Sequence, residues 1–278
     1  MQELFTRYLR LLGFDRPPSG LEGLQALVRA HITRVPFENV SKLLLFANEG
    51  RGRQTTLAEF LDGIEHHDLG GTCYTSNPFF ADLLRELGYD AVLLGCDMNN
   101  PNVHTSIRVH LDGIAYHVDV GNAAPFLEPI RLDRLPHEIL RGQMRWIFDR
   151  AQDGRLECRV YSGNEHVHGY RVNEVPHQLD FFRSIVEDSF QPGRTFMTLL
   201  RIVRIFPEHT IELKNRTLTV HRGSESHQHN LGGMIELRHA LNHHFLMPRC
   251  PVEQAIATLE SLNHIDLFAE KKESSLYA

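Results

Sequence analysis

Three observations predict an α+β fold for this chain of 278 residues. Apolar residues recur at helical spacing through the first ninety residues, and from Ala91 to about residue 175 the pattern changes to the alternation typical of strands. Beyond residue 201 a hairpin pattern precedes two further helical stretches. We therefore expect three domains: a helical bundle over residues 1–90, an antiparallel β-barrel over residues 91–200, and a smaller α/β region over residues 201–278.

The predicted helical bundle begins with two amphipathic stretches. The first has an apolar stripe that ends at Gly13 and consists of Leu4, Tyr8, Leu11 and Leu12. The second runs from Leu21 to Ile32. Pro36 cannot continue that helix because it lacks a backbone N–H and clashes with the preceding turn, so residues 35–39 are expected to form a loop or a helix break.

A further predicted helix places a cysteine at its start. Its apolar residues recur at helical spacing: Phe79, Phe80, Leu83, Leu84 and Leu87. Gly88 suits the left-handed position past a helix end, and Asn77-Pro78 is typical of a cap or first-turn pair. Cys73 would then lie just before or within the first turn, where unpaired N–H groups and the helix dipole favour a thiolate. Cys73 is therefore a candidate nucleophile, and a small buried hydrophobe is the alternative interpretation.

A hairpin pattern brings a histidine close to an aspartate. Asp112-Gly113 lies between two alternating runs rich in β-branched residues, which is a strong hairpin signal. Counting back from this loop places His104 diagonally opposite Asp119 on one face. Such diagonal neighbours are about 7–8 Å apart at the backbone, within reach of an imidazole and a carboxylate. His110 lies on the face of His104 and competes for the role of base, but it is further from Asp119 in register.

The remaining patterns complete the predicted order of elements. Strand patterns occur at residues 91–95, 105–111, 115–120, 156–161 and 169–172. Residues 179–206 have a helical pattern that breaks at residues 191–194. A second hairpin turns at Asn215-Arg216, and helices are expected from Met234 to Phe245 and from Val252 to about Ser261. Residues from Glu270 onward are expected to form a frayed tail.

The composition argues against two classes of partner. The formal charge of −6 and the pI near 6.3 disfavour general nucleic-acid binding, which needs a basic surface, but they are compatible with a local basic pocket for a phosphorylated cofactor. No apolar run approaches the roughly 20 residues of a membrane span. The first residues also lack the basic-then-apolar order of a signal peptide. A soluble cytoplasmic protein is the expectation.

The cysteines and histidines do not form a recognisable metal motif. The four cysteines, Cys73, Cys96, Cys158 and Cys250, are far apart and contain no Cys-x-x-Cys pair, so free thiols are expected. The 18 histidines include the tracts His66-His67, His227-Gln-His229 and His243-His244. None of these tracts has a zincin motif or accompanying cysteines, so surface histidines and no metal are predicted.

Three segments of the chain resemble a known family. Gly70-Gly71-Thr72-Cys73 lies at a predicted helix start, and Val118-Asp119-Val120-Gly121 carries an aspartate fifteen positions after His104. Upstream, the chain contains Val35-Pro36-Phe37-Glu38-Asn39-Val40. In these segments, with that histidine-to-aspartate spacing, the chain resembles the arylamine N-acetyltransferases.

The resemblance implies both a fold and a set of site residues. It implies a cysteine-protease-like triad between the helical bundle and the barrel, in a cleft that the α/β region covers as a lid. Cys73 would accept the acyl group, His104 would be its base, and Asp119 would orient the histidine. The residues expected to bind substrate are Phe37, Gly71, Thr72, Gly121 and Asn122. Acetyl-coenzyme A would be the donor and a small amine the acceptor, and Glu38 would form a structural ion pair with Arg7 or Arg10.

The chain also departs from the family pattern. Family members have an arginine where this chain has Leu69, a glutamate where it has Thr75, and an aromatic residue where it has Asn122. Because these positions surround the predicted triad, the departures concern the acceptor more than the chemistry.

Three functions are compatible with these residues. The first is transfer of acetyl from acetyl-coenzyme A to an arylamine or arylhydrazine through a thioacyl-cysteine, with ping-pong kinetics. The second is an amide synthase-like reaction on a carrier-bound acyl chain. The third is a cysteine hydrolase, or a triad-bearing protein without turnover.

Overall fold

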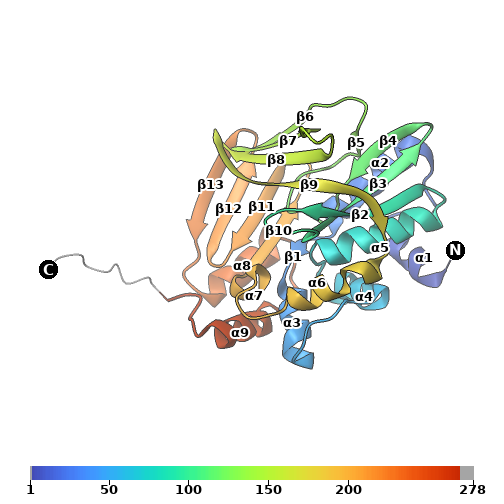
Figure 1. The fold of residues 1–278 in the computed structure, drawn as a ribbon. Helices are drawn as coiled ribbons and strands as arrows, with labels where there is room; N and C mark the ends of the chain where they lie inside the picture. Colours follow the sequence, from blue (N-terminus) through green and yellow to red (C-terminus); the bar gives the residue numbers. More distant parts are fainter. Residues whose placement is uncertain (1, 270–278) are drawn as a thin grey trace.

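The computed structural model describes residues 2–269. The N-terminal part consists of helices α1 (Glu3–Leu11), α2 (Gly20–Arg34), α3 (Val40–Glu49), α4 (Leu57–His67) and α5 (Cys73–Glu86), with a short strand β1 (Phe37–Glu38) between α2 and α3. Helices α1, α4 and α5 lie together at the right of the molecule, whereas α3 lies lower, against the C-terminal helix α9 (Val252–Asn263) (Figure 1). The two N-terminal helices that the sequence predicts are confirmed, and Gly13 follows α1 with a positive φ of 85°.

An antiparallel sheet of eight strands forms the centre of the fold, in the order β5-β4-β3-β2-β9-β8-β7-β6. Its strands are β2 (Asp90–Asp97), β3 (His104–Leu111), β4 (Ile114–Val118), β5 (Ile130–Arg131), β6 (His137–Arg141), β7 (Met144–Arg150), β8 (Leu156–Ser162) and β9 (Glu165–His177). The sheet curls towards a barrel (Figure 1), and Phe126, just before β5, packs its ring against Trp146 and Phe148 of β7. The predicted α+β class with a central antiparallel barrel is confirmed.

A second antiparallel sheet combines the N-terminal and C-terminal parts of the chain. Its order is β1-β10-β11-β12-β13, with β10 (Arg201–Ile205), β11 (His209–Lys214), β12 (Thr217–Arg222) and β13 (Glu225–Asn230). The helix break predicted at residues 35–39 is confirmed, because α2 ends at Arg34, but Phe37 pairs with Val203, so this segment contains a short strand rather than only a loop. The edge of β10 explains this strand, because it forms backbone hydrogen bonds with residues 37–38 that a local sequence pattern does not reveal.

The helical prediction for residues 179–206 is correct only in part. Short helices are present, namely η1 (Leu179–Phe182), α6 (Arg183–Asp188) and α7 (Thr195–Thr198), but residues 201–205 form the strand β10. Ile202, Val203 and Ile205 are β-branched and buried, and the strand is paired on both edges. A short apolar run does not distinguish helix from strand by periodicity, so tertiary pairing decides the outcome.

Both predicted hairpins are present. Asp112 and Gly113 have positive φ angles of 52° and 77° and join β3 to β4, which pair from Leu111 opposite Ile114 onward. Asn215, with a φ of 54°, begins the turn between β11 and β12. The final helices α8 (Met234–His243) and α9 (Val252–Asn263) start at their predicted residues.

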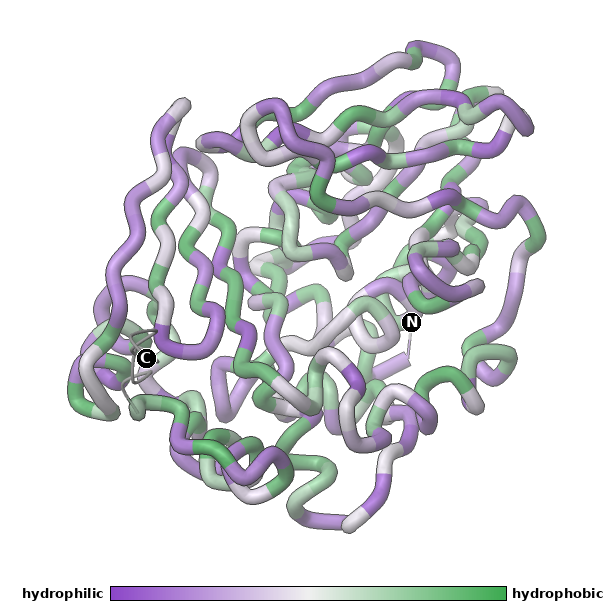
Figure 2. Tube along the Cα trace, turned by 60° about the vertical axis from the view of Figure 1, so that its left-hand side comes forward, coloured by the Kyte–Doolittle hydropathy of each residue, from purple (hydrophilic) through white to green (hydrophobic). Residues whose placement is uncertain are grey.

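Hydrophobic and hydrophilic residues alternate along several strands of both sheets (Figure 2), as expected where a strand has a core face and a polar face, whereas the edge strand β13 is hydrophilic throughout. The division of the chain at residues 90 and 200 stays a prediction, and the predicted tail from Glu270 lies outside the described residues. Within residues 2–269, none of the helices is long and apolar enough to cross a membrane.

Helix α5 packs against β2 and β3 of the eight-stranded sheet. Cys73 is its first residue, as predicted, and Gly88 follows its end with a φ of 88°. The cap predicted at Asn77-Pro78 is wrong, because both residues lie inside the helix and are buried. Thr72 is the N-cap residue instead.

Pro78 is tolerated inside α5 because its missing hydrogen bond is replaced from outside the helix. A residue at position 78 would normally donate its N–H to the carbonyl of Tyr74, and proline has no N–H. That carbonyl instead accepts a hydrogen bond from Nε2 of Gln54, at 2.7 Å. Gln54, in the loop between α3 and α4, therefore supplies the hydrogen bond that the first turn of α5 lacks.

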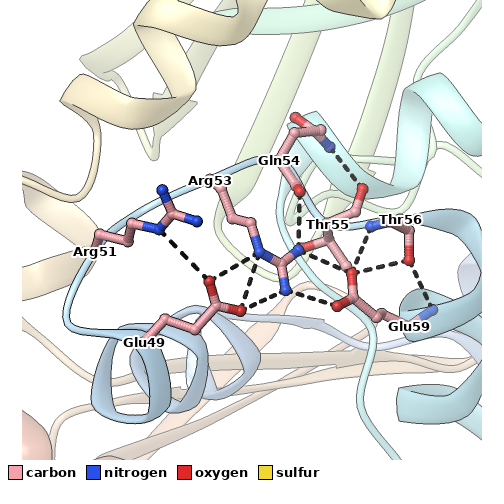
Figure 3. A network of polar contacts seen from close by, with 7 residues as sticks. All are labelled: Glu49, Arg51, Arg53, Gln54, Thr55, Thr56 and Glu59. Carbon is pink, nitrogen blue, oxygen red and sulfur yellow. Dashed lines mark hydrogen bonds and ion pairs between the residues drawn. The ribbon is translucent and has the colours of Figure 1, made fainter.

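An ionic network holds the loop that carries Gln54 (Figure 3). The guanidinium of Arg53 bonds Glu49 at the end of α3 and Glu59 in the first turn of α4. Glu59 and Thr56 also form a reciprocal capping box at the start of α4. The loop is thus anchored at both ends, which fixes the position of Gln54.

We predict that Gln54→Ala lowers the free energy of unfolding by about 1 to 2 kcal/mol, because it leaves the Tyr74 carbonyl without its donor. When Pro78 is first replaced by alanine, Gln54→Ala should lower the free energy of unfolding by less, because the N–H of that alanine can donate to the Tyr74 carbonyl. Urea unfolding of the four proteins of this double-mutant cycle measures the coupling. Equal losses in both backgrounds would contradict the account.

Candidate active site

The thiol of Cys73 lies at the N-terminus of α5, in a position fixed by the barrel. The Cys73 carbonyl accepts a hydrogen bond from Oγ1 of Thr105 on β3, at 2.9 Å. The side chain of the N-cap residue Thr72 makes no capping bond, and nothing within residues 2–269 accepts the backbone N–H of Cys73. A free N–H and the positive end of a helix dipole therefore adjoin the sulfur atom.

The side chain of His104, from β3, connects the cysteine to an aspartate. Nε2 of His104 lies 2.7 Å from Oδ2 of Asp119, and Cys73 lies close enough to the imidazole to help raise its pKa. All three residues are buried: Cys73 and His104 are 6% exposed and Asp119 is 2% exposed. The structure thus brings together the three residues predicted as a triad, while His110, the competing histidine, is exposed.

The charges of the pair His104–Asp119 stabilise each other. Burial lowers the pKa of His104, but the charges and hydrogen bonds of Asp119 and Cys73 outweigh it and raise the pKa to about 10. Burial raises the pKa of Asp119, but His104 overcomes this effect and the pKa falls to about 2. At neutral pH the pair is therefore an imidazolium and a carboxylate.

The carboxylate of Asp119 accepts hydrogen bonds from several elements besides β3. Oδ1 accepts from Nδ2 of Asn77 at 2.9 Å and from the N–H of Gly121 at 3.2 Å. Oδ2 accepts from the hydroxyl of Tyr170 at 3.1 Å and from Nδ2 of Asn122 at 3.3 Å. These donors explain how an ionised carboxylate is tolerated in the interior.

Asn77 joins α5 to the segment that follows β4. Its Nδ2 also donates to the carbonyl of Thr105, and its Oδ1 accepts from the N–H groups of Val120 and Gly121. The sequence contained a signal for this role that the cap interpretation missed. Asn77 lies four residues after Cys73, hence on the same face of the helix.

Tyr170 contacts two residues of the predicted triad, and the sequence analysis gives no signal for it. Its hydroxyl donates to Asp119 and lies 3.0 Å from Nε2 of His117, whose pKa burial lowers to about 4, so the neutral ring can donate to it. The ring centroid of Tyr170 is 5.0 Å from that of His104. Tyr170 comes from β9, 51 positions after Asp119 in the chain, and no local pattern marks it.

Two cavities are both lined by Cys73. The barrel-side cavity, of about 320 Å³, lies between the two sheets and is lined by Cys73, His104 and residues of β6, β7, β10, β11 and β12. The helix-side cavity, of about 690 Å³, is lined by Cys73, Lys42 of α3, residues 98–101 and residues 184–196. Cys73 can therefore be approached from two directions.

The predicted substrate-binding residues differ in their placement. Phe37, Gly121 and Asn122 line the barrel-side cavity, and Thr72 lines the helix-side cavity. A Cβ on Gly121 would lie 2.7 Å from Cα of Cys73, so only glycine permits this close approach. Gly71 lines neither cavity, and its carbonyl instead accepts the N–H of Glu38 at 3.1 Å.

The ion pair predicted for Glu38 is wrong. Glu38 is fully buried, and its carboxylate accepts the N–H groups of Ser41 at 2.8 Å and Gly70 at 3.0 Å. Arg7 pairs with Asp62 and Glu65 on α4 instead. Glu38 has no cation among residues 2–269, and burial raises its pKa. It ties the loop before Cys73 to the start of α3.

Lys42 is a second residue near the thiol that the sequence did not indicate. Burial lowers its pKa to about 7, against the attraction of Cys73. Its ammonium donates to Oγ of Ser189 at 2.5 Å and lies 3.6 Å from the ring centroid of Phe190.

Among residues 2–269, no group of three or more His, Cys, Asp or Glu side chains is arranged to hold a metal.

A Cys–His–Asp set at a helix start is typical of cysteine enzymes that transfer or hydrolyse acyl groups. A family model described as N-acetyltransferase matches residues 20–248. An arylamine N-acetyltransferase of Mycolicibacterium smegmatis is 28% identical over 234 residues, which cover 79% of this chain and 83% of that protein. The chain belongs to the arylamine N-acetyltransferase family, as the resemblance predicted, and it is an enzyme.

Solved structures agree with this fold. The arylamine N-acetyltransferase from Mycobacterium abscessus matches with a TM-score of 0.78 at 20% identity, covering 94% of this chain and 95% of that one. The Mycobacterium marinum enzyme, solved in complex with CoA, matches with a TM-score of 0.76 at 21% identity, covering 93% and 99%. The catalytic roles of Cys73, His104 and Asp119 stay predictions, because these matches compare folds.

We predict that the imidazole of His104 stays protonated well above neutral pH and titrates near pH 10. Its charged form stabilises the folded state, so this contribution is complete below the unfolded value of about 6.5 and is lost as the pH rises towards 10. NMR of protein labelled with ¹⁵N-histidine follows the ring directly. Asp119→Asn should lower the midpoint, and a wild-type midpoint near the ordinary histidine value of about 6.5 would contradict the ion pair.

Proposed function

We propose that this enzyme transfers the acetyl group of acetyl-coenzyme A to an arylamine or arylhydrazine through a thioacetyl form of Cys73. The observation that carries the proposal is the buried chain of contacts from Cys73 through His104 to Asp119, beside the two cavities that Cys73 lines. Family membership supports the donor, since a relative of the same fold was solved with CoA.

The first half of the reaction forms the acetyl-enzyme. The Cys73 sulfur attacks the thioester carbonyl, and the carbonyl oxygen becomes negatively charged in the tetrahedral intermediate. The free N–H of Cys73 at the helix start is the first donor to this oxyanion. The bond to the coenzyme A sulfur then breaks, and the His104 imidazolium gives its proton to the leaving thiolate.

The second half of the reaction releases the product. The amine nitrogen attacks the carbonyl of acetyl-Cys73, neutral His104 takes its proton, and the bond from carbonyl carbon to Sγ breaks. The amide leaves, and the Cys73–His104 pair returns to its initial state. Asp119 keeps Nε2 of His104 occupied throughout, so the other ring nitrogen is the one directed at the reacting atoms.

The free thiols also suit a cytoplasmic enzyme. All four cysteines are buried and unpaired in the structure, as the sequence predicted. An essential free thiol needs a reducing compartment to remain active. A thioester of coenzyme A is an intracellular donor, which supports the same location.

We predict ping-pong kinetics, with parallel double-reciprocal lines at several acetyl-coenzyme A and arylamine concentrations, because the acetyl group leaves the donor before the acceptor reacts. Cys73→Ser and His104→Gln should each lower kcat/KM by roughly a thousandfold or more. Cys250→Ala is the matched control, since this buried cysteine lies outside both cavities, and it should retain activity.

Other outcomes would assign a different reaction. Intersecting lines would exclude the covalent route. Release of acetate without an amine, at the same rate as with one, would identify a hydrolase. Failure of acetyl-coenzyme A to label Cys73, with labelling by a carrier-bound acyl chain, would identify an amide synthase-like enzyme.

A further inference from the structure

A lysine and the predicted nucleophile border the same cavity. Lys42 is the third residue of α3 and Cys73 is the first residue of α5, and both line the helix-side cavity of about 690 Å³. Lysine side chains are mostly exposed on proteins, whereas Lys42 is only partly exposed. His104 lines the barrel-side cavity and not this one, so Lys42 lies on another side of Cys73 than the histidine.

The ammonium of Lys42 is held by two residues that follow α6. Nζ donates a hydrogen bond to Oγ of Ser189 at 2.5 Å and lies 3.6 Å from the ring centroid of Phe190. That ring is buried, and a Cβ on Gly52 would lie 2.2 Å from it, so the backbone at Gly52 packs directly against the ring. These contacts give the ammonium a defined position beside the cavity.

No carboxylate among residues 2–269 pairs with this ammonium, whose hydrogen bond is to a neutral hydroxyl. Asp188 and Arg194, which also line the helix-side cavity, pair with each other at 2.5 Å. Lys42 borders a second, smaller cavity of about 30 Å³ as well. The other charged or titratable residues that line these two cavities are Arg53, Cys73, Tyr74, Asp188 and Arg194.

Cys73 is the residue of this set that can balance the charge of Lys42. Arg53 is itself a cation and bonds carboxylates of α3 and α4. The phenol of Tyr74 keeps its proton, because burial raises its pKa and its hydroxyl donates to a backbone carbonyl. Burial lowers the pKa of Lys42 to about 7, and the attraction of Cys73 opposes this effect. Because the attraction between two charges acts on both, a charged Lys42 favours the thiolate form of Cys73.

Packing alone does not account for a lysine at this position. Burying an ammonium without a carboxylate is unfavourable, and an apolar side chain such as methionine would fill similar space without that cost. Ionisable groups with strongly shifted pKa values gather at functional sites, especially in clefts. The charge of Lys42, rather than its volume, is therefore the feature that calls for a function.

We propose that Lys42 is a second cation of the active site, which acts on the Cys73 sulfur from the helix-side cavity and stabilises its thiolate form, while His104 acts from the barrel side. Lys42 acts through Cys73, so it is a positioning residue and not a catalytic one. The inference rests on the proposed function, in which Cys73 is the nucleophile. It adds a charge that depends on pH near neutrality, because His104 stays protonated up to about pH 10 whereas Lys42 loses its proton near pH 7.

The test measures the charge beside the sulfur with two alkylating reagents of similar size, the anion iodoacetate and the neutral iodoacetamide. Both react with the thiolate of Cys73, so the ratio of their rate constants does not depend on how much thiolate is present. Mass spectrometry of the peptide that contains Cys73 gives both rate constants. In the wild-type enzyme the ratio of iodoacetate to iodoacetamide should fall by about fivefold between about pH 6 and pH 8.5, because charged Lys42 attracts only the anion.

Two substitutions of Lys42 should remove this pH dependence in opposite ways. Lys42→Met should give a low ratio at both pH values, because no charge is present. Lys42→Arg should give a high ratio at both, because a guanidinium stays charged throughout this range. A role in packing alone would not produce this opposite pair. Arg51→Met is the matched control, since this exposed cation lines neither of the cavities that Cys73 lines, and it should retain the wild-type fall.

A wild-type ratio that stays constant with pH, or an equal fall in Lys42→Met, would overturn the inference. Failure of both reagents to modify Cys73 would also overturn it, because the inference requires a thiolate beside accessible cavities. Alkylation needs neither acetyl-coenzyme A nor an amine, so the readout is independent of the proposed function. A constant ratio in an enzyme that acetyl-coenzyme A labels at Cys73 would refute the role of Lys42 alone. The expected ratios without such labelling would refute only the proposed function.

Discussion

The buried carboxylate of Asp119 is the group on which the arrangement of the site depends. An ionised carboxylate in the interior is very unfavourable unless charge and hydrogen bonds compensate it. Here His104 supplies the opposite charge, and Asn77, Tyr170, Gly121 and Asn122 supply hydrogen bonds. These donors come from α5, β3, β9 and the segment after β4, so satisfying one carboxylate fixes the helix against the barrel.

The same contacts also position the sulfur atom. Asn77 and Cys73 lie one turn apart on α5, and Thr105 holds the Cys73 carbonyl on the strand that carries His104. A shift of α5 would therefore break bonds to Asp119 before it moved the thiol away from the imidazole. The hydrogen bond from Gln54 to Tyr74 stabilises this first turn, where Pro78 removes the normal bond. Helix, histidine and aspartate are thus linked by one set of hydrogen bonds.

Much of the fold and the core of the site could be predicted from local patterns. The Asp112-Gly113 turn fixes the register of β3 and β4. Because side chains alternate between the two faces of a strand, this register places His104 near Asp119. The strand β10, the hydrogen-bond partners of Glu38 and the contact of Tyr170 with Asp119 could not be predicted, because they depend on contacts between distant segments. The Asn77-Pro78 pair favours a helix start by its local pattern, but the chain tolerates this proline within the helix.

The central claim is that Cys73 becomes acetylated because His104 and Asp119 activate it. Mass spectrometry of the intact protein after rapid mixing with acetyl-coenzyme A, without an amine, tests it most directly. The account predicts one added acetyl group, located on the peptide that contains Cys73 and nearly absent in Asp119→Asn. Acetylation at another residue, or equal acetylation of Cys73 in Asp119→Asn, would contradict it.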